Sequence, residues 1–101
     1  MVAEFSIVPI GSGESLSGVV KDIVEIVDSS GLDYRLTAMG TIVEGEWDEI
    51  MSVIRKCHDK AGEAAGRVYT HVAVDDRRGA EGRIAGKVAS VEKKAGKRFR
   101  T

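Results

Sequence analysis

The stretch Thr37-Ala38-Met39-Gly40-Thr41-Ile42-Val43-Glu44-Gly45-Glu46-Trp47 predicts a tight turn, a strand and the start of a helix in direct succession. Met39-Gly40 fits the turn of a β-hairpin, because glycine enters positive φ without a steric cost. The β-branched residues at 41–43 favour a strand. Glu44 and Glu46 then interrupt the apolar run. Glu44 is therefore a candidate binding residue, although an acid exposed to solvent on a sheet face would look the same.

Hydrophobic periodicity predicts the remaining elements on both sides of this stretch. Alternating residues indicate strands at 2–10, 33–38 and 67–75. Apolar residues three and four apart indicate helices that begin after the N-cap candidate Ser15, at residue 47 and at residue 81. The second and third helices are expected to end at residues 65 and 95, and the first at 29–31. The expected apolar stripes are Leu16, Val19, Val20, Ile23, Ile26 and Val27; then Trp47, Ile50, Met51, Ile54, Cys57 and Ala61; then Ile84, Val88 and Val91.

This order, β-α-β-β-α-β followed by one more helix, is typical of the ferredoxin-like α+β fold with an antiparallel four-stranded sheet. A chain of 101 residues allows one domain, so residues 1–101 are expected to form a single ferredoxin-like unit. The stripe of the added C-terminal helix is thin. That helix is expected to lie at the edge of the domain or to pack on another subunit.

The first two helices, which belong to the β-α-β-β-α-β unit, are expected to cover one face of the sheet. The residues expected on the covered face are Phe5, Ile7, Tyr34, Leu36, Val72 and Val74, and those on the open face are Glu4, Ser6, Val8, Arg35, Thr37, Tyr69, His71 and Ala73. The turn leaves the facing of residues 41–44 undecided by one residue. The open face mixes apolar, hydroxyl, aromatic and ionisable groups, which favours pairing with another subunit and, secondly, a ligand site in that joint.

Composition excludes several classes of partner. A net charge of -1 argues against nucleic-acid binding, and the basic run at 97–100 is short and terminal. No apolar run approaches the length of a membrane helix, and no signal peptide is evident. Cys57 is the only cysteine, so no internal disulfide can form. We therefore expect a cytoplasmic protein.

The sequence offers no catalytic or metal-binding pattern. Cys57 and His58 are adjacent on a helix and point about 100° apart, so they cannot ligate the same ion. The position of Cys57 in an apolar stripe indicates an inert thiol. The glycines at 11–13 lack the spacing and the lysine of a phosphate-binding loop. We predict no catalytic residue, no metal and no cofactor.

Several segments together resemble the small thiamine-binding protein family. They are Ser15-Leu16-Ser17, Gly31-Leu32, Met39-Gly40-Thr41, Glu44-Gly45-Glu46-Trp47, Asp75-Asp76-Arg77-Arg78 and the run at 87–92. The Met-Gly-Thr and Glu-Gly-Glu-Trp segments are the most specific of these. The sequence departs from the family at Ala38, where proline often precedes the Met-Gly turn. The resemblance implies a ferredoxin-like homo-oligomer, expected to be a tetramer, that binds thiamine or its pyrimidine half.

Thiamine is a permanent cation with an aminopyrimidine ring, so its site needs a carboxylate, hydrogen-bonding groups and an aromatic face. The candidate ligand-binding residues are Glu44, Thr41, Thr37, Ser6, Tyr34 and Tyr69. Trp47 opens the second apolar stripe and is expected in the core rather than at the ligand. Two alternatives stay open: a cofactor-free enzyme, such as an oxygenase, of the dimeric ferredoxin-like type, and a purely structural oligomer.

Overall fold

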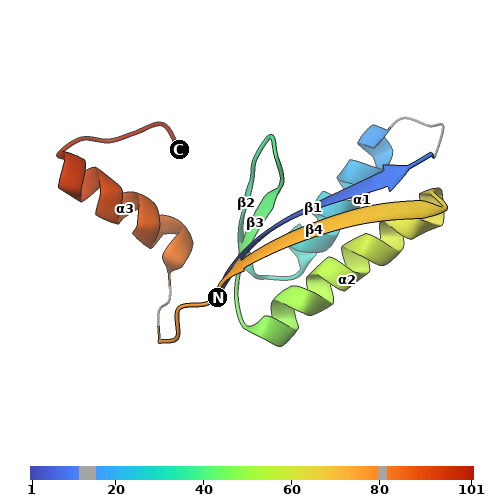
Figure 1. Cartoon of the computed structure of the whole chain (residues 1–101), viewed down its shortest axis with the longest axis horizontal. Helices are drawn as coiled ribbons and strands as arrows, with labels where there is room; N and C mark the ends of the chain where they lie inside the picture. Colours follow the sequence, from blue (N-terminus) through green and yellow to red (C-terminus); the bar gives the residue numbers. More distant parts are fainter. Residues whose placement is uncertain (12–15, 80–81) are drawn as a thin grey trace.

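The computed structural model describes residues 1–11, 16–79 and 82–101. In chain order the elements are β1 (Val2–Ile10), α1 (Leu16–Ser29), β2 (Asp33–Leu36), β3 (Thr41–Glu44), α2 (Trp47–Ala64), β4 (Arg67–Asp75) and α3 (Arg83–Ala95) (Figure 1). This order confirms the predicted ferredoxin-like α+β fold with an added C-terminal helix. The strand expected at 33–38 is two residues shorter, because the turn takes those residues. The expected cap at Ser15 lies outside the described residues, as does the expected helix start at residue 81.

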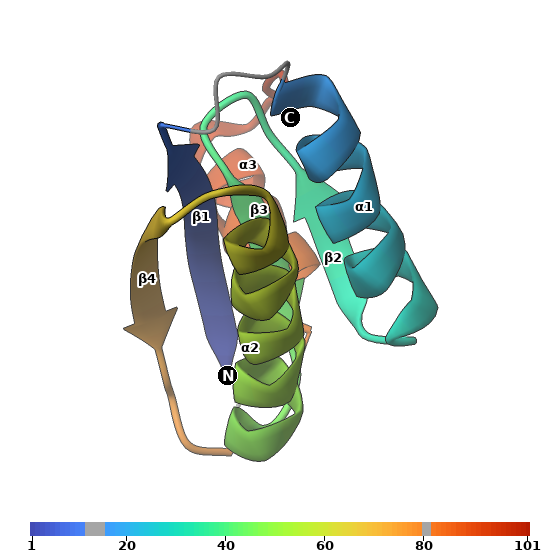
Figure 2. The ribbon, with the colours of Figure 1, turned by 90° about the vertical axis from the view of Figure 1, so that its right-hand side faces the viewer.

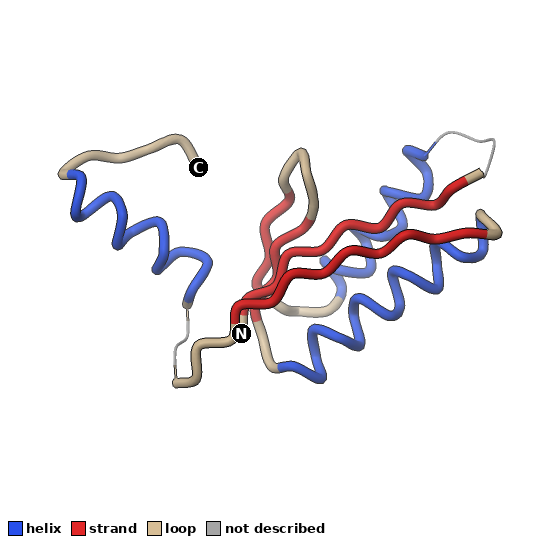
Figure 3. Tube along the Cα trace, in the orientation of Figure 1, coloured by secondary structure: helices blue, strands red, loops and turns tan. Residues whose placement is uncertain are grey.

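The four strands form one antiparallel sheet in the order β2-β3-β1-β4. Helices α1 and α2 lie side by side on one face of this sheet (Figure 2). The third helix is set apart from them, beyond the end of the sheet that holds the N-terminus (Figure 3). The molecule is therefore elongated, with extents of 48 × 28 × 20 Å. Within the described ranges, none of the helices combines the length and the apolar character needed to cross a bilayer.

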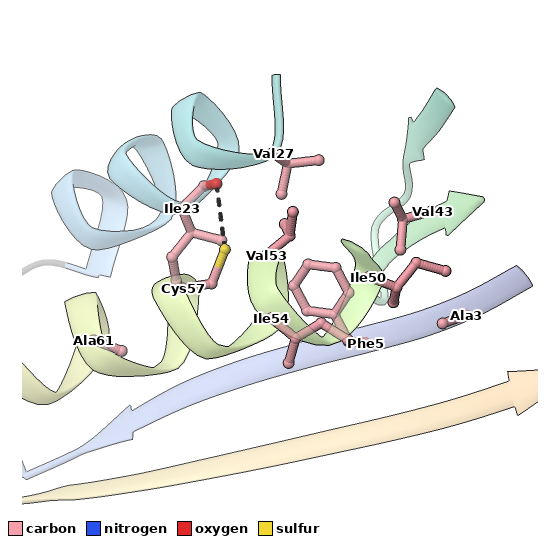
Figure 4. Packing of buried hydrophobic residues seen from close by; sticks show 10 residues of the cluster. All are labelled: Ala3, Phe5, Ile23, Val27, Val43, Ile50, Val53, Ile54, Cys57 and Ala61. Carbon is pink, nitrogen blue, oxygen red and sulfur yellow. Dashed lines mark hydrogen bonds between the residues drawn. The ribbon is translucent and has the colours of Figure 1, made fainter. Parts of the chain in front are cut away.

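The core lies between the sheet and the two packed helices (Figure 4). Its largest fully buried side chains are Phe5, Ile50, Val27, Val43 and Cys57. Phe5 stands opposite both Thr41 and Val72, which confirms that β1 and β4 turn the predicted faces toward the helices. The Cys57 thiol points at the carbonyl oxygen of Ile23, 3.8 Å away. Burial raises the pKa of this thiol to about 11, as expected of an inert cysteine.

Two of the expected apolar stripes need correction. Trp47 was expected in the core but is 55% exposed, because it is the first residue of α2 and Ile50 is the first to pack on the sheet. Val20 is 52% exposed, whereas Ile23 and Val27, in the C-terminal half of α1, are buried. Val53, which was absent from the expected stripe, is buried. The thin stripe of α3 is confirmed, since none of the described residues 83–95 is buried.

The turn before β3 forms at the predicted place for a different reason. Gly40 does not have a positive φ, so conformational freedom does not explain the glycine. The turn is held by Thr37, whose Oγ1 accepts the N–H groups of Met39 and Gly40 and donates to the carbonyl oxygen of Gly40. A Cβ at position 40 would lie 2.7 Å from the carbonyl oxygen of Phe5. Glycine is needed here because the backbone of β1 passes so close.

Candidate functional site

The sheet face that α1 and α2 leave open carries the candidate site. Strand pairing places Ser6 opposite His71, Val8 opposite Tyr69, and Glu4 between Ile42 and Ala73. Val8 and Tyr69 are 43% and 56% exposed. This face therefore offers apolar, aromatic, hydroxyl and charged groups side by side, as expected from the sequence.

Glu44 ends β3 on this open face and is half-buried there. Its Oε1 accepts the backbone N–H of Ile84, in the first turn of α3, at 3.1 Å. The first N–H groups of a helix have no partner within the helix, so Glu44 caps α3 from 40 residues away. Although burial by itself raises the pKa of Glu44, hydrogen bonds from the N–H groups of Ile84, Arg83 and Gly82 lower it overall. The carboxylate is charged at neutral pH.

A second carboxylate also contacts α3. Asp75, at the end of β4, forms an ion pair with Lys87 of α3. The hydrogen bond from Lys87 and its positive charge lower the pKa of Asp75. Both carboxylates flank Val2 in the strand register, so they lie at one end of the open face.

The six residues predicted to bind ligand do not form one cluster. Ser6, Tyr69 and Glu44 share the open face, as the strand register shows. Thr41 is buried on the opposite, helix-covered face, where it stands beside Phe5. The register thus settles the facing that the turn left undecided.

The other two candidates also lie away from the open face. Tyr34 faces the helices, and its hydroxyl donates to Oδ1 of Asp28 in α1 at 2.7 Å. That hydrogen bond is the main cause of the raised pKa of Tyr34. Thr37 lies in the turn, where its hydroxyl is engaged with Gly40.

Several ionisable residues on the open face were not among the candidates, and two of them are neighbours of Ser6. Glu4 and His71 both lie next to Ser6, one along β1 and the other across on β4. Strand alternation already placed both on this face, so the signal was present in the sequence. Within residues 1–11, 16–79 and 82–101, no three His, Cys, Asp or Glu side chains are grouped so as to hold a metal ion.

A surface hollow of about 470 Å³ lies elsewhere, between α1 and α2. Its lining includes Ile26, Val53 and Lys56, and it contains none of the six candidates. The hollow is on the far side of the helix layer from the open face, and we do not assign the ligand to it.

Charge is divided unevenly along the chain. Residues 82–101 carry seven Lys or Arg and one Glu, whereas residues 1–79 carry eight Lys or Arg and fourteen Asp or Glu. The sheet and its two helices thus form an acidic body, and α3 with the tail forms a basic arm. The net charge of -1 hides this division.

Residues 3–92 match the family described as thiamine-binding protein. The chain belongs to this family. Among the relatives of this chain, the UPF0045 protein MJ1052 of Methanocaldococcus jannaschii is 34% identical over 91 residues, covering 90% of this chain and 91% of that protein. The UPF0045 protein YqgV of Bacillus subtilis is 33% identical over 98 residues, covering 91% and 94%.

Solved structures agree with the fold. The crystal structure of MJ1052 superimposes with a TM-score of 0.81 over 89% of this chain and 93% of that one. A Thermotoga maritima protein, whose name refers to thiamine biosynthesis or salvage, has a TM-score of 0.77 at 26% identity, covering 89% and 96%. The thiamine-binding family and this structural relative both suggest a role related to thiamine.

Proposed function

We propose that this protein binds thiamine, or a related pyrimidine, without transforming it. The match of residues 3–92 to the thiamine-binding family carries the proposal. The chemistry of the open face supports it, because a cation with an aminopyrimidine ring needs a carboxylate, hydrogen-bonding groups and an aromatic surface. Glu44, Ser6 and Tyr69 offer one of each on the same face.

The proposed roles follow from these positions. Glu44 stands opposite Val2 and Tyr69 opposite Val8, so roughly 20 Å of strand separates them and one ligand molecule cannot contact both within one chain. In a joint between two subunits, the Glu44 carboxylate of one subunit faces the positive charge of the ligand. Ser6 of the other hydrogen-bonds the pyrimidine edge, and the exposed ring of its Tyr69 stacks on the pyrimidine.

We propose that Thr37, Thr41 and Tyr34 stabilise the fold around the site and do not contact the ligand. Thr37 shapes the turn, while Thr41 and Tyr34 hold the hairpin against the helices.

We also propose that the binding form is a cytoplasmic homotetramer. Both the open face and the apolar stripe of α3 are left uncovered in a single chain, and Val91 of that stripe is 57% exposed. Apolar surface of this kind is typical of subunit interfaces. The free, buried Cys57 suits a reducing compartment.

Light scattering at micromolar concentration tests the assembly. We expect a mass about four times the 10.8 kDa of the chain. Replacing exposed Val91 with glutamate is expected to lower the mass, because a charge buried at an interface without a partner is unfavourable. A mass of one chain for the unmodified protein contradicts the proposed tetramer.

Calorimetric titration tests the ligand. We expect saturable binding of thiamine, and binding about five- to tenfold weaker in Glu44→Gln, because glutamine keeps the shape and removes the charge. Asp48→Asn, a charge removal at an exposed residue of α2, is the matched control and should bind as the unmodified protein does. Failure of thiamine, its phosphates and the free pyrimidine to bind contradicts the proposal and favours a structural oligomer. Turnover of any of these compounds favours the enzyme alternative.

A further inference from the structure

The third helix is attached to the body by polar contacts. It contacts β3, but none of its described residues is buried, so apolar packing contributes little to its position. The contacts that fix it are the N–H of Ile84 on Glu44 and the ammonium of Lys87 on Asp75. Both acceptors are carboxylates of the open face.

Glu44 therefore has two uses that oppose each other. Oε1 of Glu44 accepts the N–H of Ile84, and the same carboxylate is the group that we propose to face the cation of the ligand through its remaining lone pairs. Strong pairing with a ligand cation requires that the carboxylate turn toward it, and the N-terminal N–H groups of α3 already compete for the same charge.

We propose that α3 and the ligand compete for the carboxylate of Glu44, so that ligand binding releases α3 from the sheet and docking of α3 weakens ligand binding. This inference rests on the proposed function. Because the two equilibria share one group, the coupling is reciprocal: docking of α3 weakens ligand binding by the same factor by which bound ligand weakens the docking of α3. A change that undocks α3 therefore strengthens ligand binding.

The ion pair between Asp75 and Lys87 allows a test that leaves Glu44 untouched. Asp75→Asn and Lys87→Gln both break this pair, but they change the local charge in opposite directions. A direct electrostatic effect on a cationic ligand would make Asp75→Asn bind more weakly and Lys87→Gln more tightly. Release of α3 predicts tighter binding in both.

In titrations with thiamine we expect both variants to bind about two- to fivefold more tightly than the unmodified protein, the range for loss of an exposed ion pair. Lys94→Gln, a charge removal in the last turn of the same helix, should leave the affinity unchanged. The amide proton of Ile84 reports the contact directly by NMR, because its helix position offers it no other acceptor. We expect its resonance to move upfield when thiamine saturates the protein.

The outcomes separate the two proposals. Effects of opposite sign in the two variants, or an Ile84 resonance that does not move at saturation, overturn the competition and leave thiamine binding in place. A protein that does not bind thiamine at all overturns both.

Discussion

Replacing Phe5 with alanine is expected to lower the free energy of unfolding by about 3–5 kcal/mol, the range for a buried phenylalanine. Phe5 is 2% exposed and is the largest of the fully buried side chains. It lies in β1, which pairs with both β3 and β4, so the cavity would open at the centre of the sheet. Urea unfolding followed by circular dichroism, at a fixed protein concentration, measures the change.

Val20→Ala is the control for this substitution. Val20 is 52% exposed, so its truncation should change the free energy of unfolding by no more than about 0.5 kcal/mol. Equal losses in the two variants would contradict the core described here.

Alanine in place of glycine is expected to have opposite effects at two positions. Gly40→Ala should destabilise the protein by about 1–3 kcal/mol, because the new Cβ would lie 2.7 Å from the carbonyl oxygen of Phe5 and backbone must move to admit it. Gly18→Ala should stabilise it by about 0.5–1 kcal/mol, because Gly18 is helical and its Cβ would meet nothing within 4 Å.

The same unfolding experiment measures both glycine variants. If Gly40→Ala leaves the free energy of unfolding unchanged or raises it, as Gly18→Ala is expected to do, then β1 does not pass as close to the turn as described. Thermal unfolding would also reveal the change in stability of each glycine variant, since 1 kcal/mol shifts the melting temperature of a domain of this size by several degrees.

Most of the fold could be predicted because the signals that specify it are local. Alternation in β1 and β4 and three-to-four spacing in α1 and α2 indicated these four elements and the facing of both long strands. Residues 41–44 were undecided, because a tight turn can shift a strand by one residue and invert its faces. Only the pairing of Thr41 with Phe5 settles their register. Likewise, glycine is needed at position 40 because of the backbone of Phe5, which is 35 residues earlier in the sequence and gives no local signal.

The candidate site was less predictable, because its contacts connect distant parts of the chain. Strand alternation correctly placed Ser6 and Tyr69 on the open face, and it already assigned Tyr34 to the covered one. No local pattern could indicate that Glu44 caps a helix that starts at Arg83. The exposure of Trp47 was missed for a related reason. The stripe of a helix gives the direction of each side chain, but it does not say how far along the helix the sheet extends.

The division of charge between the acidic body and the basic arm makes the molecule a strong electric dipole. In physiological salt, charges are screened over about 8 Å, far less than the 48 Å length of the molecule. A charged surface therefore interacts electrostatically only with the part of the protein that lies close to it. The net charge of -1 describes neither the acidic body nor the basic arm. The basic arm formed by α3 and the tail is therefore the part of the protein expected to face an anionic surface on approach, before any specific bond forms.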